Sequence, residues 1–229
     1  MERKILVILF GLISFITQGQ QQNCNCKYYP VKENVLEDKL ISITLSDDNI
    51  KLPDGEIYSQ WSRGNIILNN GKIIHDRIIR YNGLSDQLVV NSITENINLV
   101  VEKSTIKGFD LQLFNTDKII HYKRMSIQSL FSSDYNNAFL QVLVSGKTSL
   151  YAYRRLQQIG STDDLQMFYS YVIVKEDGSS YHFLMYSRKF IASLFPEKID
   201  IFKPQLRKRH NRIRNEEQLI KAIELINSL

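Results

Sequence analysis

Apolar and polar residues alternate with a period of two along most of this chain. From Leu40 onward, short segments rich in Ile, Val, Tyr and Phe are separated by turn residues. Because the side chains of a strand point alternately to its two faces, this period is typical of strands with one buried face. The pattern predicts a mainly β protein whose short strands form an antiparallel meander. A curved sheet, an open barrel and a two-layer sandwich are all compatible with such a meander.

Three turn sequences locate β-hairpins. Asn69-Asn70-Gly71 separates two alternating segments, and Asn-Gly supplies the positive φ angles that tight hairpin turns need. Ser145-Gly146-Lys147 and Glu176-Asp177-Gly178 separate two further pairs of segments. The hairpin strands are expected over 64–68 and 72–81, 138–144 and 148–154, and 168–175 and 180–186. Other strands are expected over 40–45, 87–91, 96–102, 106–114 and 118–122.

The hydrophobic period lengthens near the C-terminus. Residues 187–194 are expected to form a short helix that ends before Phe195-Pro196. A second helix is expected over 216–229, with Asn215 and Gln218 placed to form a capping box at its start. Its apolar residues fall on one face: Leu219, Ile223 and Ile226. We expect this helix to cover the sheet of its own domain; the alternative is a helix that binds a partner.

The first nineteen residues have the pattern of a secretory signal peptide. Arg3 and Lys4 precede an uncharged, largely apolar run over 5–16, which ends in Thr17-Gln18-Gly19. The run is too short to span a bilayer comfortably. We therefore expect cleavage before Gln20 and export to the periplasm or the cell surface, with no transmembrane segment in the mature chain.

Length and charge fit one exported domain. The chain has 229 residues, and its apolar share of 43% is ordinary for a folded protein. We expect 20–35 to be a flexible mature N-terminus, 36–202 to be the β domain, and 203–229 to be a basic segment with the last helix packed on that domain. Much of the net charge of +5 lies in this basic segment. In an exported protein we expect no nucleic acid as its partner.

Both cysteines, Cys24 and Cys26, lie near the start of the mature chain. A disulfide between them would close a very small, strained ring, so we expect no structural role. Lipid attachment at Cys24 lacks the apolar and small residues that should precede it. A metal site would need further clustered ligands. We therefore expect Cys24 and Cys26 to be incidental thiols in a disordered leader.

Motifs of catalysis or cofactor binding do not appear in the sequence. It contains no Gly-x-Ser-x-Gly elbow and no glycine-rich phosphate loop, and its one Ser-x-x-Lys match, 104–107, falls in a segment that alternates like a strand. His75, His121 and His182 lie on predicted strands but lack the close spacing usual for zinc ligands. We therefore predict no cofactor and no metal site, and an unrecognised hydrolase is the third and last functional hypothesis.

Tyrosines recur at alternate positions of three predicted strands. Tyr151 and Tyr153, Tyr169 and Tyr171, and Tyr181 with Phe183 each share one face of their own strand. If those faces coincide, they form an aromatic floor that suits sugars, lipids or peptides. The alternative is that the rings build the core or a cross-strand ladder. The leading hypothesis is a non-enzymatic envelope protein that binds an apolar or sugar-like ligand, or a protein partner, through these tyrosines.

A basic cluster precedes the last helix: Arg207, Lys208, Arg209, Arg212 and Arg214. Such a run is usually a solvated connector. In an exported protein, its candidate partners are anionic lipid headgroups, cell-wall polymers or an acidic protein patch. It supports the second hypothesis, a structural or assembly module in which the tyrosines are buried and the basic segment and last helix contact the partner.

Two stretches carry a resemblance to known proteins. One is Trp61 to Tyr81, with the 64–71 hairpin and Arg80-Tyr81-Asn82. The other is Phe195-Pro196-Glu197-Lys198, a basic stretch and a short amphipathic helix that closes in Ile226-Asn227. Together they resemble a group of exported, β-rich envelope proteins of Gram-negative bacteria. The group has no established activity, so the resemblance implies an envelope location and assigns no catalytic residue.

Overall fold

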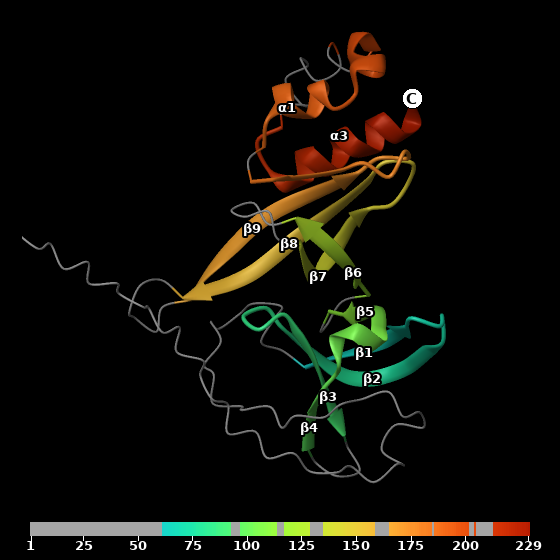
Figure 1. Ribbon diagram of the computed structural model, residues 1–229, viewed down its shortest axis with the longest axis vertical. Coiled ribbons are helices and arrows are strands. Elements are labelled where there is room, and N and C mark those ends of the chain that lie inside the picture. Colours follow the sequence, from blue (N-terminus) through green and yellow to red (C-terminus); the bar gives the residue numbers. More distant parts are fainter. Residues whose placement is uncertain are drawn as a thin grey trace, which may run out of the picture.

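The computed structural model describes residues 61–92, 97–113, 117–128, 135–158, 165–184, 186–201, 204 and 213–229 (Figure 1). Several expectations lie outside these residues: the signal peptide, Cys24, Cys26, the strand over 40–45, and Arg207, Lys208, Arg209 and Arg212.

The described residues form one open, antiparallel sheet of ten strands, which confirms the mainly β prediction. Its strands are β1 (Ser62–Leu68), β2 (Ile73–Asn82), β3 (Gln87–Ser92), β4 (Ile97–Val100), β5 (Ile106–Gln112), β6 (Ile119–Gln128), β7 (Tyr135–Val144), β8 (Ser149–Gln158), β9 (Leu165–Val174) and β10 (Ser180–Phe183). The order across the sheet is β10-β9-β8-β7-β6-β5-β1-β2-β3-β4. The meander is interrupted once, because β5 pairs with β1 and not with β4.

The three hairpin turns lie where the sequence places them. Gly71 joins β1 to β2 with a φ of +85°, and Gly178 joins β9 to β10 with a φ of +81°. These left-handed conformations favour glycine because it has no Cβ. Gly146 lies between β7 and β8, so all three predicted hairpins are confirmed.

Two predicted helices are confirmed, and in both the residue before the first turn accepts a capping hydrogen bond. Helix α1 spans Arg188–Ser193, and the Ser187 Oγ accepts a hydrogen bond from the Phe190 N–H. The 3₁₀ turn η2 (Pro196–Lys198) follows it, and α3 spans Glu216–Ser228. The Asn215 side chain caps α3 by accepting the Gln218 N–H at 2.9 Å. The return bond of the capping box is shifted by one residue, since the Gln218 Oε1 accepts the Arg214 N–H.

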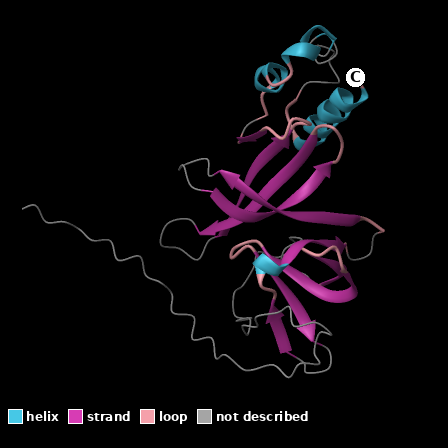
Figure 2. Cartoon of the chain, turned by 45° about the vertical axis from the view of Figure 1, so that its right-hand side comes forward, coloured by secondary structure: helices cyan, strands magenta, loops and turns pink. Residues whose placement is uncertain are grey.

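Two hydrophobic cores lie on the same face of the sheet. The N-terminal core is built by β1–β3, β5–β7 and Val101 after β4, around Tyr81, Phe109, Tyr122 and Phe139. The centroids of the stacked Phe109 and Tyr122 rings are 4.7 Å apart. The helix core lies between β7–β10 and the two helices α1 and α3. Figure 2 shows these helices together at one end of the sheet. The last helix therefore packs on its own domain, with Leu219, Ile223 and Ile226 buried as its periodicity predicts.

A third, smaller core lies on the opposite face. It brings Ile127 of β6 and Leu140 of β7 together with Tyr151 of β8 and Val172 of β9. The far end of β6 therefore lies against β8 and β9 (Figure 1), and the Gln128 carbonyl oxygen is 2.9 Å from the His182 ring. The sheet is accordingly folded over part of itself.

Candidate functional site

The strand register separates the candidate tyrosines onto two faces. Tyr151 lies opposite Val172, whereas its neighbour Ala152 lies opposite Tyr171. Residues directly opposite in an antiparallel pair share a face, so Tyr151 and Tyr153 point away from the side that holds Tyr169 and Tyr171. The pairing of Tyr181 with Ile173 places Tyr181 on the side of Tyr171. The five tyrosines therefore do not form one aromatic floor.

Tyr171 is part of the helix core. It is 2% exposed, its hydroxyl donates to the Glu216 carboxylate at 3.0 Å, and it lies 2.5 Å from the Tyr186 hydroxyl. Burial, followed by the hydrogen bond with Tyr186, raises the pKa of Tyr171 far above its ordinary value. Tyr181 packs partly buried against the same core. Both side chains hold the helices on the sheet.

Tyr151 and Tyr153 lie under the folded-over end of β6. Tyr151 is 6% exposed within the third core, and the Lys123 ammonium lies 5.8 Å from its ring centroid. The Tyr153 hydroxyl accepts a hydrogen bond from Arg155 at 3.0 Å. Burial is the main cause that raises the Tyr153 pKa. These two rings also serve the packing of the sheet.

Tyr169 differs from the other four because it is 45% exposed. The Arg154 guanidinium lies 5.3 Å from its ring centroid, within the range of a cation–π contact. Arg154 is itself held from two sides: its Nε donates to Gln141 at 2.7 Å, and its Nη2 donates to both Glu216 oxygens at 2.8 Å. We call Tyr169, Arg154, Gln141 and Glu216 the Tyr169 platform. An exposed ring above a fixed cation is a preorganised surface for a flat, polar ligand.

Ser170 and His182 form a pair that sequence reasoning missed. The Ser170 Oγ is 2.8 Å from the His182 Nε2, and the His182 Nδ1 is 2.9 Å from the Gln128 carbonyl oxygen. Because a carbonyl can only accept, Nδ1 carries the proton and Nε2 of the neutral ring accepts the serine hydroxyl. Burial lowers the pKa of His182. Only the β9–β10 register could have indicated this diagonal contact, since the two residues lie on neighbouring strands of that hairpin.

The pair has the atoms of a nucleophile and its base, but not the access that catalysis needs. Ser170 is 0% exposed, so a substrate cannot reach its Oγ in this structure. Ser170 and His182 therefore link β9, β10 and the end of β6 as a structural contact.

His121 has a different partner, the Asp110 carboxylate at 2.7 Å on the surface. Within the described ranges, no group of three or more His, Cys, Asp or Glu residues is arranged to hold a metal ion.

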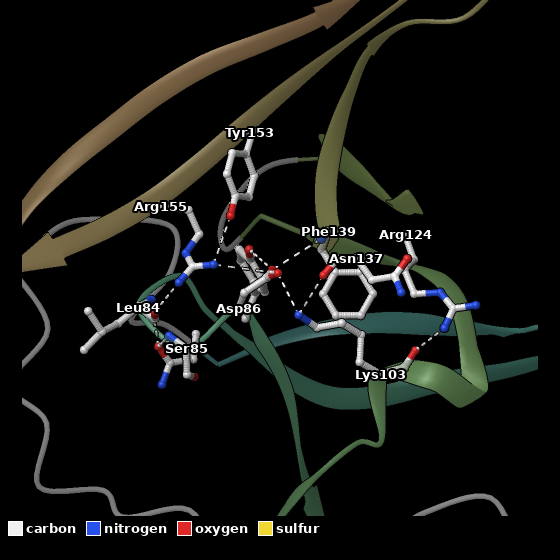
Figure 3. Close-up of polar contacts among 11 residues, drawn as sticks. Leu84, Ser85, Asp86, Lys103, Arg124, Asn137, Phe139, Tyr153 and Arg155 are labelled. Atoms are coloured by element: carbon white, nitrogen blue, oxygen red, sulfur yellow. Dashed lines mark hydrogen bonds and ion pairs between the residues drawn. The ribbon is translucent and has the colours of Figure 1, made fainter. Parts of the chain in front are cut away.

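A polar network surrounds Asp86, a turn residue between β2 and β3 (Figure 3). Its carboxylate accepts hydrogen bonds from the Tyr81 hydroxyl and the Lys103 ammonium, both at 2.7 Å. It also accepts the Phe139 N–H at 3.3 Å, and the Arg155 Nη1 is 3.9 Å away. The Asp86 backbone has a φ of +55°, a left-handed conformation that Asp tolerates better than most residues. The sequence predicts a turn here, between the strands expected over 72–81 and 87–91, but does not indicate the role of Asp86.

The basic cluster is represented in the described residues by Arg214 alone. It is exposed and lies just before α3, close in sequence to Glu216 of the Tyr169 platform. None of the helices that the structure describes is long and apolar enough to cross a membrane.

No protein-family model matches this chain, and no curated protein or solved structure is detectably similar to it. The function proposed below therefore rests on the geometry of the described residues and on the sequence.

Proposed function

We propose that this chain is a non-enzymatic, exported protein that binds a sugar-like component of the bacterial envelope at the Tyr169 platform. One observation carries the proposal: Tyr169 is 45% exposed, and the Arg154 guanidinium beside its ring is held by hydrogen bonds to Gln141 and Glu216. Sugar rings present an apolar face that packs on an aromatic ring, and their hydroxyls bond to charged and amide groups at its edge. The platform offers the Tyr169 ring and, near it, the partly exposed Glu216 carboxylate that Arg154 holds in place.

Export is proposed from the sequence. The pattern over 1–19 is that of a signal peptide, and the resemblance to exported envelope proteins points to the same compartment. N-terminal sequencing of the protein purified from its native envelope tests this part directly. A mature chain that begins at Gln20 is the expected result, and an intact Met1 would contradict it.

The second candidate is an assembly module that contacts a protein partner through the basic segment and the last helix. It is favoured by the burial of Tyr151 and Tyr171, which act in packing. In this case Tyr169 would not contribute to binding, and the interaction would depend on 203–214 and on the exposed side of α3.

A binding experiment separates the two candidates. The protein is purified from native envelope extract and examined by native mass spectrometry, and its affinity for purified muropeptides and core oligosaccharides is measured by calorimetry. We expect a retained or titrated glycan whose binding is at least about tenfold weaker in Tyr169→Ala and nearly intact in Tyr169→Phe. Ile119→Ala is the matched control, because it also truncates an exposed apolar side chain of the sheet. A retained protein and no effect of Tyr169→Ala would favour the assembly module.

A further inference from the structure

Strands β7 and β8 pair over only part of their length. The ladder contains Gln141 opposite Ala152 and Val142 opposite Tyr151, although β7 begins at Tyr135 and β8 continues to Gln158. The same register would place Phe139 opposite Arg154. The two strands instead diverge (Figure 1), so their backbone groups on this side need other partners.

The turn Gly83–Asp86 lies between the diverging strands and bonds to both. The Leu156 N–H of β8 donates to the Gly83 carbonyl at 3.2 Å, and Arg155 donates to the Leu84 carbonyl at 2.8 Å. On the other side, the Phe139 N–H of β7 donates to the Asp86 carboxylate (Figure 3). We call residues 83–86 the wedge, since they occupy the place where the two strands would otherwise meet.

Charge holds the wedge in place. The Asp86 side chain is 3% exposed, and a buried carboxylate is tolerated only when cations and donors surround it. Here Lys103 and Tyr81 supply the short bonds and Arg155 supplies a second cation. The two bonds that the Phe139 and Leu156 N–H groups donate to the wedge are long, at 3.3 and 3.2 Å, and contribute less.

The wedge lies between two parts of the sheet that have largely separate cores. The N-terminal leaf comprises β1–β7 and holds most of the N-terminal core, against which Met167 of β9 also packs. The C-terminal leaf comprises β8–β10 with α1 and α3 and holds most of the helix core, to which Val144 at the end of β7 also contributes. The short β7–β8 ladder and the third core also join them. We propose that the wedge keeps β7 and β8 apart and that Asp86 locks it, so that without the lock these strands open locally while both leaves stay folded.

Amide hydrogen exchange, followed by NMR on the full mature chain, tests the proposal with Asp86→Asn. Asparagine keeps the oxygen that accepts the Tyr81 and Phe139 donors but removes the charge that binds Lys103. We expect the Phe139 and Leu156 amides to exchange at least about tenfold faster, while the amides of Leu219–Ile226 in α3 keep their rates. Asp110→Asn is the control, because it removes a carboxylate from a surface pair and is expected to change neither amide.

Unchanged exchange at Phe139 and Leu156 would overturn the proposal. An equal increase in α3 would also overturn it, because it would mean that the whole fold is destabilised. If Asp86→Asn does not fold, Arg155→Gln replaces it, since this change leaves the Asp86–Lys103 pair in place. In this variant we expect the exchange rate to increase more at the Leu156 amide than at the Phe139 amide. An equal increase in exchange rate across the sheet and α3 would contradict the proposal.

Discussion

Arg154 of β8 and Glu216 of α3 meet across 62 residues of sequence, with one guanidinium nitrogen 2.8 Å from both carboxylate oxygens. Tyr171 donates to the same carboxylate, so Glu216 accepts from two points of the sheet. The first residue of the last helix is therefore fixed to the sheet by charge, while the apolar face of the helix packs on the core below it.

Glu216→Gln is expected to destabilise the protein by about 2 kcal/mol. The amide keeps the shape of the carboxylate but gives up one charge-assisted pair with Arg154, which is largely buried. Chemical denaturation followed by circular dichroism measures the change. Glu217→Gln is the matched control in the same helical turn, because Glu217 pairs with the exposed Lys221, and little change is expected. Equal effects of the two variants would contradict this account.

Gly146 and Asn227 are expected to be energetically coupled. The Asn227 side chain accepts the Thr148 N–H at 2.8 Å and donates to the Thr148 carbonyl at 2.9 Å, and a Cβ on Gly146 would lie 2.5 Å from its amide nitrogen. Asn227→Ala should cost about 1–2 kcal/mol in unfolding free energy through the lost bonds. Gly146→Ala should break the same contacts by displacing the side chain, so the double variant should be less destabilised than the sum of the single variants. Additive losses in denaturation experiments would show that the two sites are independent.

His182 is expected to make stability depend on pH below its ordinary pKa of 6.5. Burial lowers its pKa in the folded state, so the unfolded chain binds the proton more readily in the window below 6.5. The contribution of the neutral ring is present above this window and is lost as pH falls through it. As the pH is lowered from 7.5 to 5, the measured free energy of unfolding should therefore decrease less steeply in His182→Gln than in the wild type. His121→Gln controls for the loss of one imidazole, and parallel curves for wild type and His182→Gln would refute the prediction.

Gly108→Ala is expected to be among the most destabilising single changes in the sheet. A Cβ at Gly108 would lie 2.2 Å from the Tyr122 carbonyl oxygen on β6, and backbone cannot yield as a side chain does. We expect a loss of about 3 kcal/mol, or failure to fold. Gly71→Ala, where a Cβ meets open space and only the positive φ opposes it, should cost about 1 kcal/mol. Thermal unfolding compares the stability of the two variants. A larger loss of stability in Gly71→Ala than in Gly108→Ala would contradict the crowding at Gly108.

The elements of the fold were predictable because they depend on local patterns. Turn glycines such as Gly71 and Gly178 and the cap Asn215 act within a few residues, so the sequence shows them directly. The strand over 118–122 was predicted too short, since β6 extends to Gln128. The buried face of α3 was also predictable from the spacing of its apolar residues.

The candidate site was not predictable to the same degree, because it depends on register and on contacts between distant residues. Which face Tyr169 shares with Arg154 is decided by the β8–β9 pairing, and no local signal fixes that register. In the sequence, Asp86 is an ordinary turn aspartate, because its role depends on the divergence of β7 and β8, which only the structure shows. The Ser170–His182 contact likewise requires the two strands of a hairpin to be aligned in space.

The position of β1 has a consequence for how the chain acquires its structure. Although β1 precedes the other described strands in sequence, it lies inside the sheet, between β2 and β5. When β1–β4 have formed their meander, no other described strand pairs with the second edge of β1 until residues 106–112 arrive. An unpaired edge readily captures strands from other molecules. A chain that emerges with its N-terminus first is therefore prone to aggregation from the time β1 has folded until β5 pairs with it.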